Sequence, residues 1–210
     1  ISLNPSCAAA HQWFSNFLSV SSRFGESFEE IALARRLDPL NLVIRNDEGL
    51  AQIYAGNEER GMALLRETIA LDRNFPLSRL YLSLAAARRG QMGVATAEAK
   101  TAMKLLEGDP DPIALYGYVS ARAGRPQEAR DALRQLEELS RARFVSSLPK
   151  ALLHIGLGEK EAALSALEEA YEQREGRLVY LNVDRIFDPL RSEPRFRTLI
   201  ARLKIPARPQ

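Results

Sequence analysis

The chain has 210 residues, of which 46% are hydrophobic and 27% are charged, and its formal net charge is +2. This composition is ordinary for a soluble globular protein and too apolar for a wholly disordered chain. A net charge so close to zero gives no electrostatic reason to expect the whole chain to bind nucleic acid or an anionic membrane.

The sequence also bears on targeting. It contains no run of 18 or more apolar residues, so we expect no transmembrane helix. The first 14 residues lack a basic start and contain Asn4, Pro5 and His11, which argues against a signal peptide. A single cysteine, Cys7, excludes an internal disulfide and agrees with a reducing, cytoplasmic compartment. Because the sequence starts with Ile1 rather than Met, we interpret it as part of a longer or processed polypeptide.

Small residues recur at a fixed interval along the chain. Gly56, Gly90, Gly124 and Gly158 follow one another at spacings of 34 residues, and one step back gives Ser22. If these residues occupy the fifteenth place of a 34-residue unit, five units begin at Ala8, Leu42, Pro76, Pro110 and Phe144. Each unit is predicted to be two helices that break at the fifteenth place, because glycine readily adopts the left-handed conformation that ends a helix.

Two further places of the unit hold only small residues. The eighth place holds Ser15, Gly49, Ser83, Gly117 and Ala151, and the twentieth holds Ser27, Gly61, Ala95, Ala129 and Ala163. Ten small residues at ten places are improbable at average composition. Since two helices approach closely only where side chains are small, the two helices of each hairpin are predicted to meet at these places.

The predicted second helices are amphipathic. Residues 64–72 and 163–173 carry apolar side chains at i, i+3, i+4 and i+7. The connections 72–78 and 108–112 place proline at or just before the next helix, where its missing N–H does no harm. We therefore predict an all-α array in which each unit buries its apolar face on its neighbours.

This register resembles that of the tetratricopeptide repeat (TPR), whose 34-residue unit carries W-x2-L-G-x2-Y, A-x3-F and a closing proline. The matching phrases are "YGYVSARAGRPQEARDAL" at 116–133 and "LARRLDP" at 33–39, and the closing proline occurs only as Pro39. The resemblance implies an all-α, right-handed superhelix (an α-solenoid) of about five hairpins over residues 1–175. Capping helices and a tail would then follow at 176–210.

The end of the chain is predicted to close the array. Residues 177–190 are predicted to add one helix and a turn, with Asp188 and Pro189 as a helix start. After Ser192 a short helix is predicted with Phe196, Leu199, Ile200 and Leu203 on one face. A terminal repeat otherwise exposes one apolar face, so we expect this helix to act as a lid.

The first predicted helix carries three aromatic residues, Trp13, Phe14 and Phe17, with no amphipathic helix before it. Two interpretations are open. The first, which we prefer at this point, is ordinary core packing inside the first unit. The second is stacking on further repeats, on another domain or on a second chain.

No combination of residues indicates catalysis. His11 and His154 are far apart in the sequence, and there is no Cys pair or His-x-x-x-His motif for a metal. Residues 156–161 begin like a dinucleotide fingerprint but lack its third glycine and a preceding strand. Asp109 and Asp111 lie in an Asp-Pro turn. We therefore predict no enzymatic activity, no cofactor, no metal site and no small-molecule substrate.

The resemblance implies that the first helix of each unit lines a concave groove. The corresponding candidate residues are Val43, Asn46, Leu50, Ile53, Tyr54, Leu77, Leu80, Leu84, Arg88, Tyr118, Arg122 and Leu152. They lack the lysines with which some relatives hold a terminal carboxylate, and they favour an amphipathic helix or an extended apolar peptide. The alternative is that the groove is filled by the protein's own C-terminal helix or by packing between units.

The closing phrases add a second resemblance. "AHQWFSNFL" at 10–18 and "FDPLRSEPRF" at 187–196 resemble the C-terminal repeat segments of large bacterial signalling proteins. In those proteins the repeats follow a class III adenylate/guanylate cyclase, a serine/threonine kinase or a winged-helix regulator. The resemblance implies a non-catalytic interaction module with a protein or peptide partner, or alternatively a segment that dimerises the parent protein. Residues 174–210 carry nine basic and four acidic side chains, without the interleaved aromatics of a nucleic-acid site.

Overall fold

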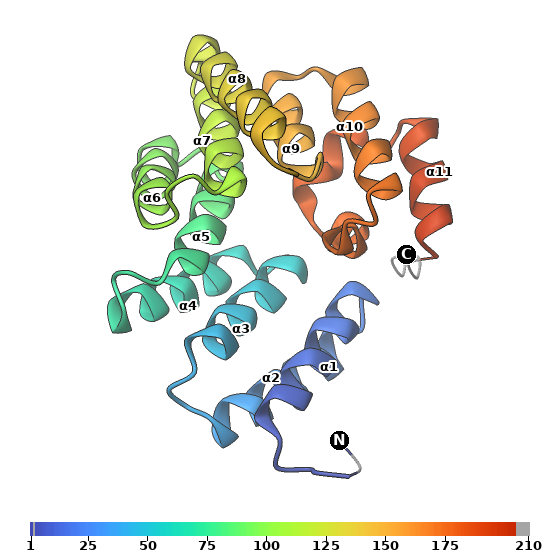
Figure 1. Cartoon of the computed structure of the whole chain (residues 1–210). Helices are drawn as coiled ribbons and strands as arrows, with labels where there is room; N and C mark the ends of the chain where they lie inside the picture. The colour runs from blue at the N-terminus through green and yellow to red at the C-terminus, as the bar shows by residue number, and fades with distance from the viewer. Residues whose placement is uncertain (2, 205–210) are drawn as a thin grey trace.

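A computed structural model describes residue 1 and residues 3–204 of the chain. Within this range all regular structure is helical, in antiparallel pairs that stack side by side along a curved array (Figure 1). The five pairs are α1 (Ala8–Val20) with α2 (Phe24–Leu37), α3 (Leu42–Tyr54) with α4 (Glu58–Leu71), α5 (Pro76–Arg88) with α6 (Met92–Leu105), α7 (Pro110–Arg122) with α8 (Pro126–Ala142), and α9 (Leu148–Leu157) with α10 (Lys160–Glu172). The predicted all-α solenoid of helix hairpins is confirmed.

The break within each hairpin follows the predicted chemistry. Gly56, Gly90, Gly124 and Gly158 all have positive φ, between 73° and 92°. Ser22 takes the same left-handed conformation in the first hairpin, with a φ of 60°. This conformation strains a residue that has a Cβ, so the first turn is less favourable than the four glycine turns.

Small residues allow the paired helices to touch. A Cβ atom added to Gly61 of α4 would lie 2.5 Å from Ile53 Cγ1 and 2.6 Å from the carbonyl oxygen of Gly49 in α3. Where serine replaces glycine, the hydroxyl group fills the contact. Ser15 Oγ donates to the Ser27 carbonyl at 2.9 Å, and Ser83 Oγ donates to the Ala95 carbonyl at 2.8 Å.

The first four hairpins begin where the 34-residue register predicts, at Ala8, Leu42, Pro76 and Pro110. The fifth begins at Leu148, four residues after Phe144, which is exposed. The delay follows from α8, which is 17 residues long and runs on to Ala142.

The residues after α10 differ from the prediction. Residues 177–190 do not form an α-helix. They form two 3₁₀ helices, η1 (Gly176–Asn182) and η2 (Arg185–Leu190). Pro189 lies inside η2 instead of starting a helix, because the Asp184 side chain, which accepts from the Ile186 amide, begins that element earlier.

The predicted closing helix is present as α11 (Pro194–Leu203). Phe196 and Leu199 are buried, and Ile200 and Leu203 pack against the same core at its edge. This face of α11 therefore packs on the core, and its role as a lid stays a prediction.

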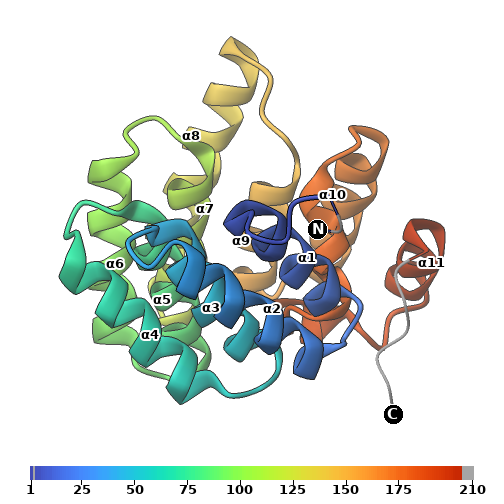
Figure 2. The same ribbon diagram turned by 90° about the horizontal axis from the view of Figure 1, so that it is seen from below.

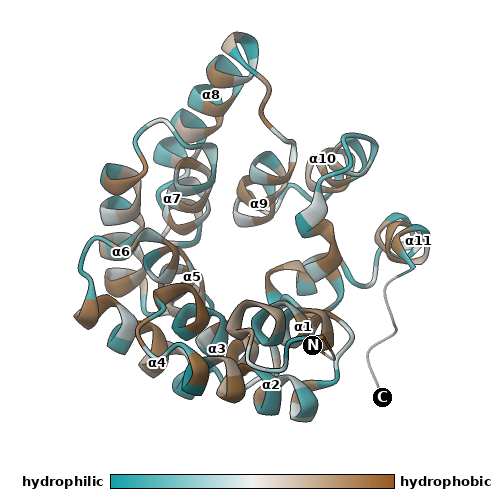
Figure 3. Ribbon diagram, turned by 60° about the horizontal axis from the view of Figure 1, so that its bottom comes forward, coloured by the Kyte–Doolittle hydropathy of each residue, from teal (hydrophilic) through white to brown (hydrophobic). Residues whose placement is uncertain are grey.

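The array curves so that its two ends approach each other. Figure 2 shows α1 beside the segment that follows α10, and residues of α1 contact η1. The helices carry hydrophobic and hydrophilic residues on different faces along the whole curve (Figure 3). None of the described helices is long and apolar enough to cross a membrane.

Candidate interaction surfaces

The concave side of the array contains the residues predicted to form a peptide groove. Asn46, Ile53, Tyr54 and Tyr118 are buried; Leu50, Leu77, Leu80, Leu84, Arg88 and Leu152 are half-buried; Val43 and Arg122 are exposed. The structure therefore brings most of these residues together, but few of them are open to solvent.

The protein's own C-terminal segment covers the centre of this groove. The rings of Tyr54 in α3 and Tyr180 in η1 lie 5.4 Å apart, centroid to centroid. Arg88 of α5 donates to Asp184, between η1 and η2, at 3.2 Å. Filling of the groove by C-terminal residues was one alternative from the sequence. The structure has this arrangement, but the filling residues are those of η1 and η2 rather than of α11.

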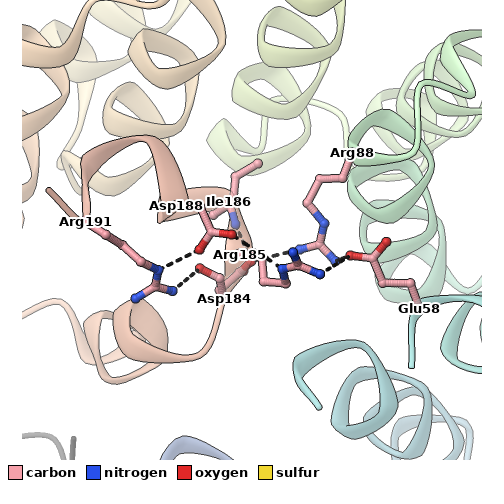
Figure 4. A network of polar contacts seen from close by, with 7 residues as sticks. All are labelled: Glu58, Arg88, Asp184, Arg185, Ile186, Asp188 and Arg191. Atoms are coloured by element: carbon pink, nitrogen blue, oxygen red, sulfur yellow. Dashed lines mark hydrogen bonds and ion pairs between the residues drawn. The ribbon is translucent and has the colours of Figure 1, made fainter. Parts of the chain in front are cut away.

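Ion pairs hold the C-terminal segment against the concave face (Figure 4). Arg88 lies between Glu58 at 3.0 Å and Asp184 at 3.2 Å, which joins α4, α5 and the segment. Arg185 lies 3.7 Å from the same Glu58 carboxylate, and Arg191 donates to the Asp184 carbonyl at 3.3 Å. Burial raises the pKa of the Asp184 carboxyl, although the Arg88 guanidinium opposes this effect.

A second anchor lies at the start of the segment. Arg177 pairs with Asp111 of α7 at 2.5 Å and with Glu175 at 3.1 Å. Asp109, the other carboxylate of the Asp-Pro turn, accepts from the Asp111 amide and caps α7. The two aspartates thus have structural contacts: one caps a helix and the other holds the C-terminal segment.

Sequence reasoning missed a buried polar cluster at the N-terminal end of the groove. Asp47 of α3 accepts hydrogen bonds from Gln12 at 2.8 Å and from Asn16 at 2.9 Å, both in α1. Asn46 donates to the other Asp47 oxygen at 3.2 Å and accepts from Ser78 at 3.0 Å. Asn16 and Asn46 therefore bond to residues of other helices, Asp47 and Ser78, and a 34-residue pattern of small and apolar residues does not record such pairings.

The face of α1 that carries aromatic residues is open. Trp13 is 69% exposed and Phe17 57% exposed, and the rings of Phe14 and Phe17 lie parallel, with centroids 6.3 Å apart. The preferred interpretation from the sequence, core packing inside the first unit, is wrong for these residues. Ser15, which contacts Ser27 of α2, lies on the opposite side of α1.

The repeat register explains why this face is open. Phe17 occupies the tenth place of its unit, and the tenth-place residues of the other four units are all buried: Ala51, Ala85, Val119 and Leu153. In each inner unit the first helix contacts the second helix of the preceding hairpin. Among the described residues no such helix precedes α1, so its stacking face meets solvent.

The described residues contain no group of three or more His, Cys, Asp or Glu side chains that could hold a metal ion. Each histidine has a carboxylate partner instead. His11 pairs with Glu30 at 2.5 Å, and His154 pairs with Glu159 at 2.7 Å.

No protein-family model matches the sequence, and no curated protein matches it. Solved structures do match. A chain of the APC/C hetero-tetramer Cut9-Hcn1 is 15% identical, with a TM-score of 0.66 over 96% of this chain. MamA from Desulfovibrio magneticus RS-1 is 12% identical, with a TM-score of 0.57 over 91% of this chain and 98% of its own. YrrB, described as a TPR protein with an unusual peptide-binding site, is 17% identical, with a TM-score of 0.52 over 85% of this chain and 93% of its own.

The chain has a TPR-like repeat fold. It spans 44% of the matched Cut9-Hcn1 chain, 98% of the matched MamA chain and 93% of the matched YrrB chain. At these identities the likeness concerns the fold. Within a TPR-like array, the two surfaces of this chain differ plainly: the concave face is covered by residues 176–190, whereas the stacking face of α1 is uncovered.

Proposed function

We propose that the chain is a non-catalytic protein-binding scaffold and that its partner docks on the face of α1 formed by Trp13, Phe14 and Phe17. The observation that carries the proposal is the exposure of these three aromatic residues on one helix face. Exposed apolar clusters rich in aromatic residues are typical of protein interfaces. Repeat arrays of this kind commonly serve as binding surfaces.

The occupant that fits this face is an amphipathic α-helix. Every inner first helix is covered by a helix, as α2 covers α3 and α4 covers α5. The docking surface of α1 is equivalent to the surface of α3 that α2 covers. A partner helix would therefore cross α1 as α2 crosses α3. Peptide contact on the concave side would then be confined to exposed groove residues such as Val43 and Arg122, because the C-terminal segment covers the centre.

The resemblance of residues 10–18 and 187–196 to bacterial signalling proteins supports a finer proposal. Residues 1–175 would be the repeat array and 176–210 its cap and tail, together forming the C-terminal regulatory part of a cyclase, kinase or winged-helix regulator. The partner helix would then belong to that protein. The second candidate is homodimerisation of the parent, which the same exposed aromatic face favours.

The proposal is tested by photo-crosslinking from α1. A benzophenone amino acid replaces Phe17, and a control places it at Arg134, an exposed position of α8. The crosslinked segment is identified by mass spectrometry, synthesised as a peptide and titrated into the purified chain while Trp13 fluorescence is recorded. We expect a helical peptide that shifts Trp13 emission to shorter wavelength and that binds Trp13→Glu and Phe17→Glu at least tenfold more weakly.

Two results would contradict the proposal. If Phe17 crosslinks only to another copy of the same chain, and light scattering shows a dimer that Trp13→Glu dissociates, α1 is a dimer interface. If the peptide binds both glutamate variants as tightly as the wild type, α1 is not its docking surface.

A further inference from the structure

A cavity remains between the concave face and the C-terminal segment, and the packing of the repeats does not account for it. Its volume is about 140 Å³. On this scale one water molecule needs roughly 10–15 Å³, so the cavity has room for a ligand of about ten non-hydrogen atoms. Its walls come from α3, α5, α7, α9 and both 3₁₀ helices.

Three tyrosines from separate elements line this cavity: Tyr54 of α3, Tyr81 of α5 and Tyr180 of η1. Tyr54 and Tyr180 are tilted by 30° to each other. Leucines, including Leu84 and Leu152, complete the wall. The faces of aromatic rings carry negative charge density and attract cations, most strongly where water is excluded.

Carboxylates outnumber cations around the cavity. Asp111 and Asp184 line it directly, and each shares its arginine with another carboxylate. Asp47 takes part in no ion pair among the described residues and is held by amide groups alone. Counted with their ion-pair partners, the groups around the cavity are six carboxylates and four guanidinium groups: Asp47, Glu58, Asp111, Glu175, Asp184 and Asp188, against Arg88, Arg177, Arg185 and Arg191.

The tyrosine hydroxyls experience this excess of negative charge. Burial raises the pKa of Tyr54, and the nearby Asp184 and Asp47 raise it further. Burial also raises the pKa of Tyr81, with Asp47 as the next largest cause. The three hydroxyls therefore stay neutral, and the surplus of carboxylates makes the electrostatic potential in the cavity favourable for a cation.

We propose that the cavity binds a small organic cation, such as a quaternary ammonium or guanidinium group, either free or at the end of a peptide side chain. The cation contacts the faces of Tyr54, Tyr81 and Tyr180 and is balanced by Asp111 and Asp184. Because these residues belong to the array and to the C-terminal segment, the ligand holds the segment against the concave face. This site is separate from the α1 surface and does not depend on the proposed function.

The test uses the full chain and two probes of equal shape. Choline carries a quaternary nitrogen, and 3,3-dimethylbutan-1-ol carries a neutral carbon in its place. Each is titrated by calorimetry at constant ionic strength, and the melting temperature is recorded at saturation. We expect choline to bind and raise the melting temperature, and the neutral alcohol to bind at least tenfold more weakly.

Substitutions then test the rings. Tyr81→Leu removes the aromatic face while keeping apolar bulk and is expected to weaken choline binding about tenfold, whereas Tyr81→Phe keeps most of the affinity. Tyr116→Leu is the matched control, since Tyr116 lies outside the cavity and donates to Glu128. Tyr180→Leu provides a second ring deletion if Tyr81→Leu fails to fold.

A further arm distinguishes the source of the cation. Tighter binding of N-acetyl-trimethyllysine methylamide than of choline supports a peptide side chain, and the reverse supports a free molecule. Equal binding of choline and the neutral alcohol, or no binding of any cationic probe, overturns the proposal.

Discussion

The apolar face at the C-terminal end of the array is covered, whereas the apolar face at the N-terminal end is exposed. At the C-terminal end, η1, η2 and α11 cover the last hairpin, and the ring of Phe196 packs 6.3 Å from that of Phe187. At the N-terminal end, the described residues before α1 leave Trp13 and Phe17 exposed. The contrast is that the last hairpin is covered by its own chain, whereas the face of α1 has no cover among the described residues.

Charge reinforces this difference. Two of the three arginines of α11, Arg195 and Arg202, are paired with α10. Arg195 donates to Glu168 at 2.6 Å, and Arg202 pairs with Glu172 at 2.8 Å while lying 4.1 Å above the Tyr171 ring. These contacts are exposed and individually weak, but together they orient the cap on the last hairpin.

Removal of the cap is expected to have the largest effect. Deletion of residues 187–210 removes the buried side chains of Phe187, Leu190, Phe196 and Leu199. At about 2–5 kcal/mol for each lost large apolar side chain, the sum is on the order of 10 kcal/mol, comparable to the whole stability of a typical domain. We expect the truncated chain to unfold at a much lower temperature and to aggregate, as measured by circular dichroism and light scattering.

The control for this deletion is the double substitution Arg197→Ala and Thr198→Ala, which changes exposed positions of α11. It should alter the unfolding free energy by less than about 1 kcal/mol. Unchanged melting of the truncated chain would show that the C-terminal residues are not a cap, and would return them to the role of a partner-binding tail.

A matched pair of substitutions compares the two ends directly. Phe196→Ala removes a ring that is 1% exposed and should cost about 3–5 kcal/mol of unfolding free energy. Phe17→Ala removes a ring at the open end and should cost less than about 0.5 kcal/mol. Chemical denaturation of the two variants measures both values. Equal costs would mean that the face of α1 is covered in solution.

The features that could be predicted from the sequence are those that depend on local conformation and side-chain size. The 34-residue register predicted the hairpins, the left-handed turns at the fifteenth place and the close contact at Gly49 and Gly61, because these depend on local conformation and on side-chain size. Phe196 and Leu199 were predictable as a lid because their spacing places them on one helix face.

The remaining features depend on contacts between distant parts of the chain. The pairing of Arg88 with Asp184 joins residues 96 positions apart, and no local pattern contains it. The exposure of Trp13 was mispredicted because aromatic residues are usually buried and the sequence does not state which helix will cover them. The cavity tyrosines were only partly recognised: Tyr54 was a groove candidate, while Tyr81 and Tyr180 were not.

Acid is expected to weaken the C-terminal end first. Burial alone would raise the pKa of Glu175, but hydrogen bonds from Arg177 and Ser146 outweigh it and lower the value to about 2. Since this pKa lies below the ordinary 4.5, the contribution of Glu175 to the unfolding free energy is complete above pH 4.5. That contribution is lost as the pH falls towards 2. Glu175→Gln should cost on the order of 1 kcal/mol at pH 6 and much less at pH 2.5, whereas Glu107→Gln, at an exposed site, should cost little at either pH.

Base should weaken the N-terminal end by a smaller amount. The hydrogen bond to Glu30 and then that to the Pro5 carbonyl raise the pKa of His11 above 6.5, because only the protonated ring donates from both nitrogens. The resulting stability is complete below pH 6.5 and is lost as the pH rises through the folded-state pKa. Hydrogen exchange, corrected for its intrinsic pH dependence, should therefore show α1 opening more readily at pH 8 than at pH 6, and His11→Gln should abolish this difference. If α1 is equally protected at both values in the wild-type chain, the two ends do not respond to pH in opposite directions.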